Sequence, residues 1–471
     1  MIGMTAATLS VGGVRMSAEG NRPENGDVPP PVSFREAFFF WLKLGFVSFG
    51  GPAGQISLMH QELVEQRRWI SERRFLHALN YCMVLPGPEA QQLATYIGWL
   101  MHRTRGGIAA GVLFVLPSLF ILIALSWWYI ALGEMPLVAG LFYGIKPAVT
   151  AIVVQAAYRI GSRALKNRLL WAIAAASFVA IFALDVPFPL IVALAALIGY
   201  LGGRLAPHHF AANGGHGDTQ KSFGRALIDD DTPTPDHALF NGRRLLQVVV
   251  AGALLWILPM GALTVMYGWE HTLTQMGAFF TKAALLTFGG AYAVLPYVYQ
   301  GAVGDFGWLT PTQMIDGLAL GETTPGPLIM IVAFVGFVGG YQTPEMLALF
   351  EPEYRFLAGA LAASLVTWFT FLPSFIFILL GGPLVETTHG QLKFTAPLTA
   401  ITAAVVGVIL NLALFFGYHV LWPQGFGGGF DWISAAIALA AAFALFRLQQ
   451  SIMRVIAACA LIGLLIKVSG F

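Results

Sequence analysis

The sequence predicts an all-α membrane protein: a polytopic helical bundle of two inverted-topology repeats with broken or re-entrant helices. Composition, an internal repeat and the placement of arginine predict it. Of 471 residues, 57% are hydrophobic and 11% charged, and the mean hydropathy is +0.71, whereas soluble domains carry roughly 25% charged residues. Many apolar stretches run for about 20 residues, the length of a membrane-crossing helix. Backbone groups in lipid must be paired within a segment, so we expect helices; the alternating pattern of barrel strands is absent.

Polar stretches divide the chain into four parts. Residues 1–33 are polar, rich in Gly, Pro and Asn, and lack the apolar core of a signal peptide, so we expect a disordered N-terminal tail. Residues 34–203 form a first transmembrane repeat, and 204–243 a polar cytoplasmic linker. Residues 244–471 supply an additional helix and then the second repeat.

The two halves resemble one another at a constant offset of 239 residues (282 − 43). Several independent matches at one offset, without a gap, indicate a true internal repeat, which is the usual plan of secondary transporters. The matching stretches are 43–51 with 282–290, Trp69 with Trp308, Pro86-Gly87-Pro88 with Pro325-Gly326-Pro327 and, after an insertion near 341–355, Leu116-Pro117-Ser118 with Leu372-Pro373-Ser374.

Loop charges indicate that the second copy is inverted. The loop at 60–74 holds four arginines, whereas its counterpart at 301–313 holds Asp305 and neither Lys nor Arg. Cytoplasmic loops are enriched in Lys and Arg, so equivalent loops of opposite character are expected on opposite sides of the membrane. An odd number of apolar segments between the starts of the two copies predicts the same inversion.

The segment at 75–101 has two possible paths. Arginines occur both at 60–74 and at 102–106, and a crossing segment between them would place these loops on opposite sides. A re-entrant segment, bent at Pro86-Gly87-Pro88, would leave both in the cytoplasm, as the positive-inside rule favours. We expect the re-entrant path, and by the same logic a break in the segment 36–59 at its paired glycines.

Gly/Pro breaks inside apolar segments predict a binding site. They leave backbone groups unpaired, which is tolerated at membrane depth where the chain is buried in protein or lines a wet cavity. Proline favours the first turn of a helix, and helix N-termini bind anions. The alternative is that the breaks are kinks that allow close helix packing. The candidate substrate-binding residues are Lys43, Ser48, Gly50, Gly51, Pro86, Gly87, Pro88, Glu89 and Gln91 in the first half, and Lys282, Thr287, Gly289, Gly290, Thr324, Pro325, Gly326 and Pro327 in the second.

Charged residues within these apolar segments have a functional and a structural interpretation. Lys43 and Lys282 are equivalent, and either offset the charge of an anion or snorkel to the interface. Lys146 is a third intramembrane cation, without a counterpart in the repeat. Glu89 and Glu322 are the candidate proton-coupling groups, although Glu89 also suits the first turn of a helix, where the dipole stabilises a carboxylate.

Other classes of function lack their signatures. No phosphate-binding G-x-x-x-x-G-K-[ST] loop, catalytic triad or metal-hydrolase pattern occurs, so we expect neither an enzyme nor an ATP-driven pump, and no cofactor. His208, His209 and His216 have no metal-site spacing, Cys82 and Cys459 lie in apolar segments, and we expect no metal and no nucleic-acid partner. The sequence leaves the oligomeric state open, a homodimer included.

The stretch from Leu85 to Trp99, the Phe49-Gly50-Gly51-Pro52 turn and the Thr324-to-Pro327 break resemble the chromate ion transporter family in its long, two-domain form. This resemblance implies a multi-pass protein of the bacterial inner membrane that exports chromate, driven by the membrane potential or a proton gradient, and so confers chromate resistance. It also implies that sulfate is a related anion. The alternative to chromate export is therefore a transporter or exchanger of sulfate or another oxyanion. A non-transporting receptor or scaffold would gain nothing from repeated breaks. The copies differ where Leu328 stands at the position equivalent to Glu89.

Overall fold

The computed structural model describes residues 28–133, 135–210, 223–388 and 395–469. Most of the tail expected at 1–33 lies outside these residues. The described part is helical, without named strands, which confirms the all-α prediction. Six of its helices are long and apolar enough to cross a membrane. Exposed apolar side chains such as Val265 (87%) and Leu258 (63%) on the outer faces suit contact with lipid.

The first half begins with short helices on either side of a break. They are α1 (Phe34–Val47), α2 (Gly51–His60), the π-helical turn η1 (Gln61–Gln66) and α3 (Glu72–Val84). Longer helices follow: α4 (Glu89–Leu132), α5 (Pro136–Ala164), α6 (Arg168–Leu184), α7 (Phe188–Leu205) and the short α8 (Pro207–Phe210). α4 is two helices joined at a kink, because His102 and Arg103 have non-helical backbone angles and Arg103 has a φ of 58°.

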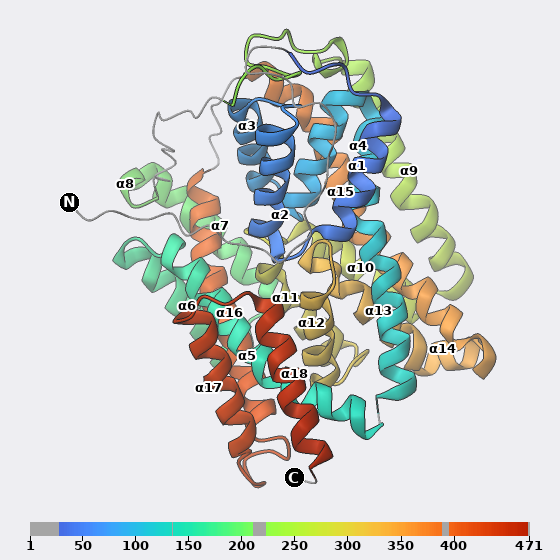
Figure 1. Ribbon diagram of the computed structural model, residues 1–471, viewed down its shortest axis with the longest axis vertical. Coiled ribbons are helices and arrows are strands. Elements are labelled where there is room, and N and C mark those ends of the chain that lie inside the picture. The colour runs from blue at the N-terminus through green and yellow to red at the C-terminus, as the bar shows by residue number, and fades with distance from the viewer. Residues whose placement is uncertain (1–27, 134, 211–222, 389–394, 470–471) are drawn as a thin grey trace.

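After the linker, α9 (Gly242–Tyr267) runs along the outside of the molecule (Figure 1). The second repeat contains α10 (Thr272–Leu285), α11 (Ala291–Tyr299), the π-helical turn η3 (Gln300–Asp305), α12 (Pro311–Thr323), the 3-10 turn η4 (Leu328–Met330) and α13 (Ile331–Gln342). α14 (Pro344–Leu349) and the 3-10 turn η5 (Pro352–Tyr354) lead to α15 (Arg355–Thr388), and α16 (Thr395–Leu421), α17 (Trp432–Phe446) and α18 (Ile452–Val468) complete the chain.

The repeat seen in the sequence is also a repeat of structure. α3 and α12 begin and end 239 residues apart (311 − 72), and the two π-helical turns, η1 and η3, keep the same spacing. π-helices are rare, so two at equivalent positions are hard to obtain by chance. Trp69 and Trp308 are buried at equivalent places behind these turns. The insertion predicted near 341–355 is α14 with η5.

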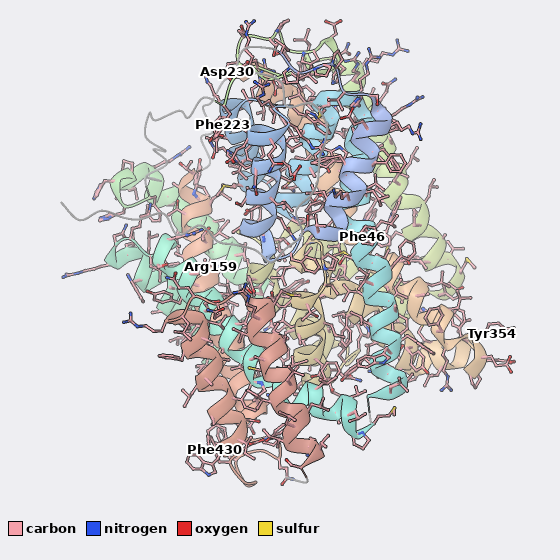
Figure 2. All side chains as sticks on the ribbon, viewed as in Figure 1. Phe46, Arg159, Phe223, Asp230, Tyr354 and Phe430 are labelled. Atoms are coloured by element: carbon pink, nitrogen blue, oxygen red, sulfur yellow. The ribbon has the colours of Figure 1, made fainter. Side chains whose placement is uncertain are left out.

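α3 and the first part of α4 form a hairpin whose two open ends meet the same segment of the linker. The amide of Ser71, before α3, donates to the carbonyl of Ile228, and the His237 ring contacts the carbonyl of Trp99, near the end of the hairpin's second arm, at 2.9 Å. Figure 2 shows Phe223 and Asp230 of this segment at one end of the molecule, next to α3. The backbone of this hairpin turns at Pro86-Gly87-Pro88, as a re-entrant segment would. That it enters and leaves the membrane on one side stays a prediction.

Candidate functional site

The four breaks of the two repeats meet at one place. The amide of Gly87 donates to the carbonyl of Thr287 (2.7 Å), and the amide of Gly326 donates to the carbonyl of Ser48 (2.8 Å). Thr287 and Gly326 lie 239 residues after Ser48 and Gly87, so the same contact is made twice, once in each direction. Reciprocal contacts of this kind are what a two-fold relation between two units produces.

A second pair of contacts repeats this exchange. A Cβ atom added to Gly87 would lie 2.4 Å from the hydroxyl oxygen of Ser374, and one added to Gly326 would lie 2.7 Å from the Cβ of Ser118. Both glycines also have positive φ angles, 127° and 104°, which side chains disfavour. The Pro-Gly-Pro turn of each repeat therefore packs against the Leu-Pro-Ser triplet of the other, and both turns require glycine.

Hydroxyl groups at the breaks are used mostly within their own helices. Ser48 and Thr287 are fully buried and donate to carbonyls one turn earlier, at 2.6 and 2.7 Å. Thr324 donates to the carbonyl of Gly321. These bonds stabilise the ends of the short helices and leave the hydroxyl oxygens as acceptors, so these groups do not provide the donor hydrogens that an oxyanion needs.

Unpaired polar atoms surround the break. Of the buried side-chain oxygens without a hydrogen-bond partner among the described residues, four lie near the breaks, and they belong to Gln55, Gln91, Gln92 and Ser118. The side-chain nitrogen of Gln55 donates to the carbonyls of both Ser48 and Gly326, so Gln55 joins the two repeats. Buried unpaired polar groups are uncommon and usually mark a site for water or a ligand. Sequence reasoning selected Gln91 but not Gln55, which follows the expected break by only a few residues.

The half-helices begin where the sequence predicts, with one difference. Pro88 caps α4, with Glu89 in its first turn, while Gly50 and Gly290 cap α2 and α11. Pro327 instead caps the 3-10 turn η4, and the α-helix α13 starts only at Ile331. The expected half-helix at Pro327 is therefore delayed, because the backbone first makes one tighter turn.

The charged candidates lie in different settings. Glu322 is buried and accepts a hydrogen bond from Tyr292, which follows the break in the second repeat. Glu89 is half-buried and has no hydrogen bond or ion pair to another described residue. Lys43 of α1 and Lys282, in the last turn of α10, are exposed and have no ion pair among the described residues. Their exposure favours the snorkelling interpretation over direct contact with an anion.

Sequence reasoning missed two charged groups, Arg159 beside Glu322 and Asp316 farther along α12 from the break. Arg159 of α5 interacts electrostatically with both Glu322 and Tyr292, and Figure 2 shows it near mid-height in the molecule. Arg159 belongs to an arginine-rich stretch that resembles any cytoplasmic loop, so no sequence signal separates it. Asp316 of α12 is buried (2% exposed), lies 3.6 Å from Lys146 and accepts a hydrogen bond from Tyr129. Lys146 was noticed in the sequence, but its partner was not.

A cavity of about 790 Å³ lies between α4, α9 and α15. Its lining is mostly apolar and includes none of the break residues. No group of three or more His, Cys, Asp or Glu side chains suited to a metal occurs in the described part of the chain. The converging breaks, rather than this cavity, therefore hold the candidate site.

Comparison with known proteins gives a consistent result. The chain matches the family model described as chromate transporter over residues 35–200 and 274–464. It is 34% identical to a chromate transport protein of Pseudomonas aeruginosa over 386 residues, 81% of this chain and 80% of the relative. It is 29% identical over 390 residues to a chromate transport protein of Cupriavidus metallidurans, covering 82% and 83%. An uncharacterized Bacillus subtilis transporter, YwrB, matches over 134 residues at 29% identity, covering 28% of this chain and 68% of the relative. No solved structure matches.

Proposed function

Because the chain belongs to the chromate transporter family, we propose that it is a secondary active transporter that exports chromate from the bacterial cytoplasm and thereby confers chromate resistance. The family is one of transporters rather than enzymes. The chain itself is a multi-pass membrane protein, and its bacterial relatives indicate the inner membrane. Export, the coupling to a membrane potential or proton gradient, and resistance are the parts that we propose.

The observation that carries the proposal is the reciprocal pair of hydrogen bonds between the breaks of the two repeats. It brings the starts of α2, α4 and α11 into one region that also contains buried side-chain oxygens without a hydrogen-bond partner among the described residues. Free amides at helix starts attract anions, and chromate is a tetrahedral dianion that can accept several such bonds. Arg159, close to Glu322 and Tyr292, supplies a positive charge beside this region.

We propose further that the second repeat is inverted relative to the first in the membrane. The reciprocal contacts at Gly87 and Gly326 support a two-fold relation, and the opposite charges of the loops at 60–74 and 301–313 support its orientation. Transporters with this plan expose a central site to each side in turn, as one part rocks against the other.

Coupling to protons needs a group that changes its charge during the cycle. Glu89 and Glu322 lie at the breaks, and each belongs to only one repeat: Leu328 replaces Glu89, and Met83 replaces Glu322, in the other copy. A carboxylate beside the site that takes up a proton when chromate leaves would couple the two movements. The two repeats then make different contributions, the first through Glu89 and the second through Glu322.

The test is a flux measurement on the purified full-length chain in proteoliposomes. We expect chromate uptake that accelerates when a pH gradient or a membrane potential is imposed, and inhibition by sulfate that is weaker than by unlabelled chromate. Equal inhibition by both anions would indicate a general oxyanion transporter. Absence of chromate flux under every imposed gradient, in a preparation shown to be folded, would refute the proposal and favour a receptor or scaffold.

A further inference from the structure

A buried polar contact fastens α12 to two other helices. The Oδ2 atom of Asp316 accepts a hydrogen bond from the Tyr129 hydroxyl (2.9 Å) and lies 3.6 Å from the Lys146 ammonium. Tyr129 is in the last turn of α4, and Lys146 precedes the proline inside α5. We call Asp316, Tyr129 and Lys146 the outer clamp. The Oδ1 atom of Asp316 is buried and has no hydrogen-bond partner among the described residues.

The outer clamp has a counterpart in the other repeat. His77 lies 239 residues before Asp316, and Val385 follows Tyr129 by 256, the spacing of the two Leu-Pro-Ser triplets (372 − 116). His77 and the carbonyl of Val385 are in contact at 3.4 Å. Therefore α3 of the first repeat contacts α15 of the second, and α12 of the second repeat contacts α4 of the first, at equivalent positions.

The counterpart is also polar, but differently built. Next to Val385, Glu386 of α15 accepts a hydrogen bond from Tyr96 and lies 3.9 Å from a guanidinium nitrogen of Arg74. Arg74 also donates to the carbonyl of Thr232 in the linker, so this contact lies at the arginine-rich end of the molecule. We call His77, Arg74 and Glu386 the inner clamp. The inner clamp thus holds the hairpin that α3 begins, and the outer clamp holds the hairpin that α12 begins. The inner clamp contacts Tyr96 in the first part of α4, whereas the outer clamp includes Tyr129 in the last turn of α4.

We propose that Asp316 is a proton-exchange site of the transport cycle, and that its protonation opens the outer clamp. This inference rests on the proposed function and deepens it. A proton from water on the outer side neutralises the carboxylate, which breaks the ion pair with Lys146 and weakens acceptance from Tyr129. The Lys146 side chain, which is 27% exposed, is then released from Asp316. α12 is then free to move, and the proton leaves to the cytoplasmic side after the movement.

The groups around Asp316 suit this role. α4 and α5 place Tyr129 and Lys146 against it, and among the described residues α13, α16 and α18, which also pack on α12, place no further charged or titratable side chain that interacts with it. The charge of the clamp is therefore decided by one proton on Asp316. An intramembrane carboxylate is costly to bury and is retained where it has a function.

The first test separates coupling from binding in proteoliposomes of the full chain. We expect Asp316→Asn to lose the acceleration of chromate flux by a pH gradient while it retains exchange of chromate for chromate, because exchange needs no net proton movement. Asp431→Asn is the matched control, since Asp431 accepts a hydrogen bond from Tyr143 of α5 at 3.0 Å and lies outside the clamp. Wild-type acceleration in Asp316→Asn, or loss of exchange together with acceleration, would overturn the inference.

The second test needs no chromate and so does not depend on the proposed function. With Cys82 and Cys459 replaced by alanine, the chain has no other cysteine, and Ile315→Cys provides a probe beside Asp316 that is buried in the closed clamp (1% exposed). Because thiol reagents react with the thiolate, whose fraction falls with pH, each labelling rate is divided by that of the same variant unfolded in denaturant at the same pH. We expect this normalised labelling rate to rise about tenfold between about pH 8 and about pH 5.5, and to be high at both pH values after Asp316→Asn. A normalised labelling rate that is the same at both pH values while Asp316 is present would overturn the inference. If this test succeeds but wild-type chromate flux is absent, the clamp stands and the proposed substrate fails.

Discussion

Replacing Gly326 by alanine should break the contact between the two repeats at its tightest point. The new Cβ would lie 2.7 Å from the Cβ of Ser118, and the backbone at Gly326 has a φ of 104°. A left-handed conformation costs a non-glycine residue roughly 1–2 kcal/mol, and overpacking typically costs about 1–3 kcal/mol more. We therefore expect destabilisation of about 2–5 kcal/mol.

The chain offers a control that separates the two contributions. Gly290 also has a positive φ, 95°, but an added Cβ would meet no atom within 4 Å. Gly290→Ala should thus cost only the backbone part, about 1–3 kcal/mol, because a φ of 95° with a ψ of 173° lies in a region that essentially only glycine adopts. Adding Ser118→Gly to Gly326→Ala removes the Cβ atom that the new alanine would press against. The double variant should therefore regain the stability that Gly326→Ala loses beyond the loss in Gly290→Ala.

The assay is thermal unfolding of the purified chain in detergent at one scan rate, since unfolding of large proteins is often irreversible and scan-dependent. The expected order of apparent midpoints is wild type, Gly290→Ala, then Gly326→Ala, with the double variant close to Gly290→Ala. Equal midpoints for the two single variants would show that the Pro-Gly-Pro turn does not press on Ser118, and our account of the contact between the repeats would be wrong.

Three further predictions follow from other contacts. Arg159→Gln should raise the KM for chromate at least about tenfold, or roughly 1.4 kcal/mol, in a proteoliposome flux assay, whereas Lys43→Ala should leave it unchanged because Lys43 is exposed; loss of flux in Lys43→Ala would return that lysine to the site. Tyr292→Phe should lower stability by about 1–3 kcal/mol, seen as a lower thermal midpoint, because Glu322 loses its donor; an unchanged midpoint would contradict this. Burial, together with Arg103 and Arg244, lowers the pKa of His237, so the unfolded linker binds more protons, and the protection factors of amides at 223–241 (intrinsic exchange rate divided by observed rate at the same pH) should fall as the pH falls below about 6.5; His237→Asn should remove that pH dependence of the protection factors.

Much of the fold could be predicted because its signals are local. The repeat is visible as identical triplets at one offset, and the turn between α3 and α4 coincides with Pro86-Gly87-Pro88, whereas the re-entrant path inferred from the arginines in loops stays a prediction. The starts of α2 and α4 were predicted from proline and glycine alone. The π-helical turns η1 and η3 were not, since nothing in residues 61–66 marks an extra residue per turn.

The site could be predicted only in part, because contacts between distant segments leave no local pattern. The breaks were found, but the sequence does not show that Gly87 bonds to Thr287 rather than to its own repeat. Lys43 and Lys282 were candidates for buried cations because their segments are apolar. Both instead lie on the exposed faces of their helices. Asp316 was missed because its partners come from α4 and α5, which are far from it in the sequence.

The reciprocal bonds at Gly87 and Gly326 have a consequence for the energies of the two facing states. If the repeats exchange roles during transport, the contacts at the centre are nearly the same before and after, so they contribute little to the difference in free energy between the states. That difference must come from the parts in which the repeats differ, chiefly the inner and outer clamps. Selection could then shift the resting population toward one side of the membrane by changing a clamp, while the anion site stays as it is.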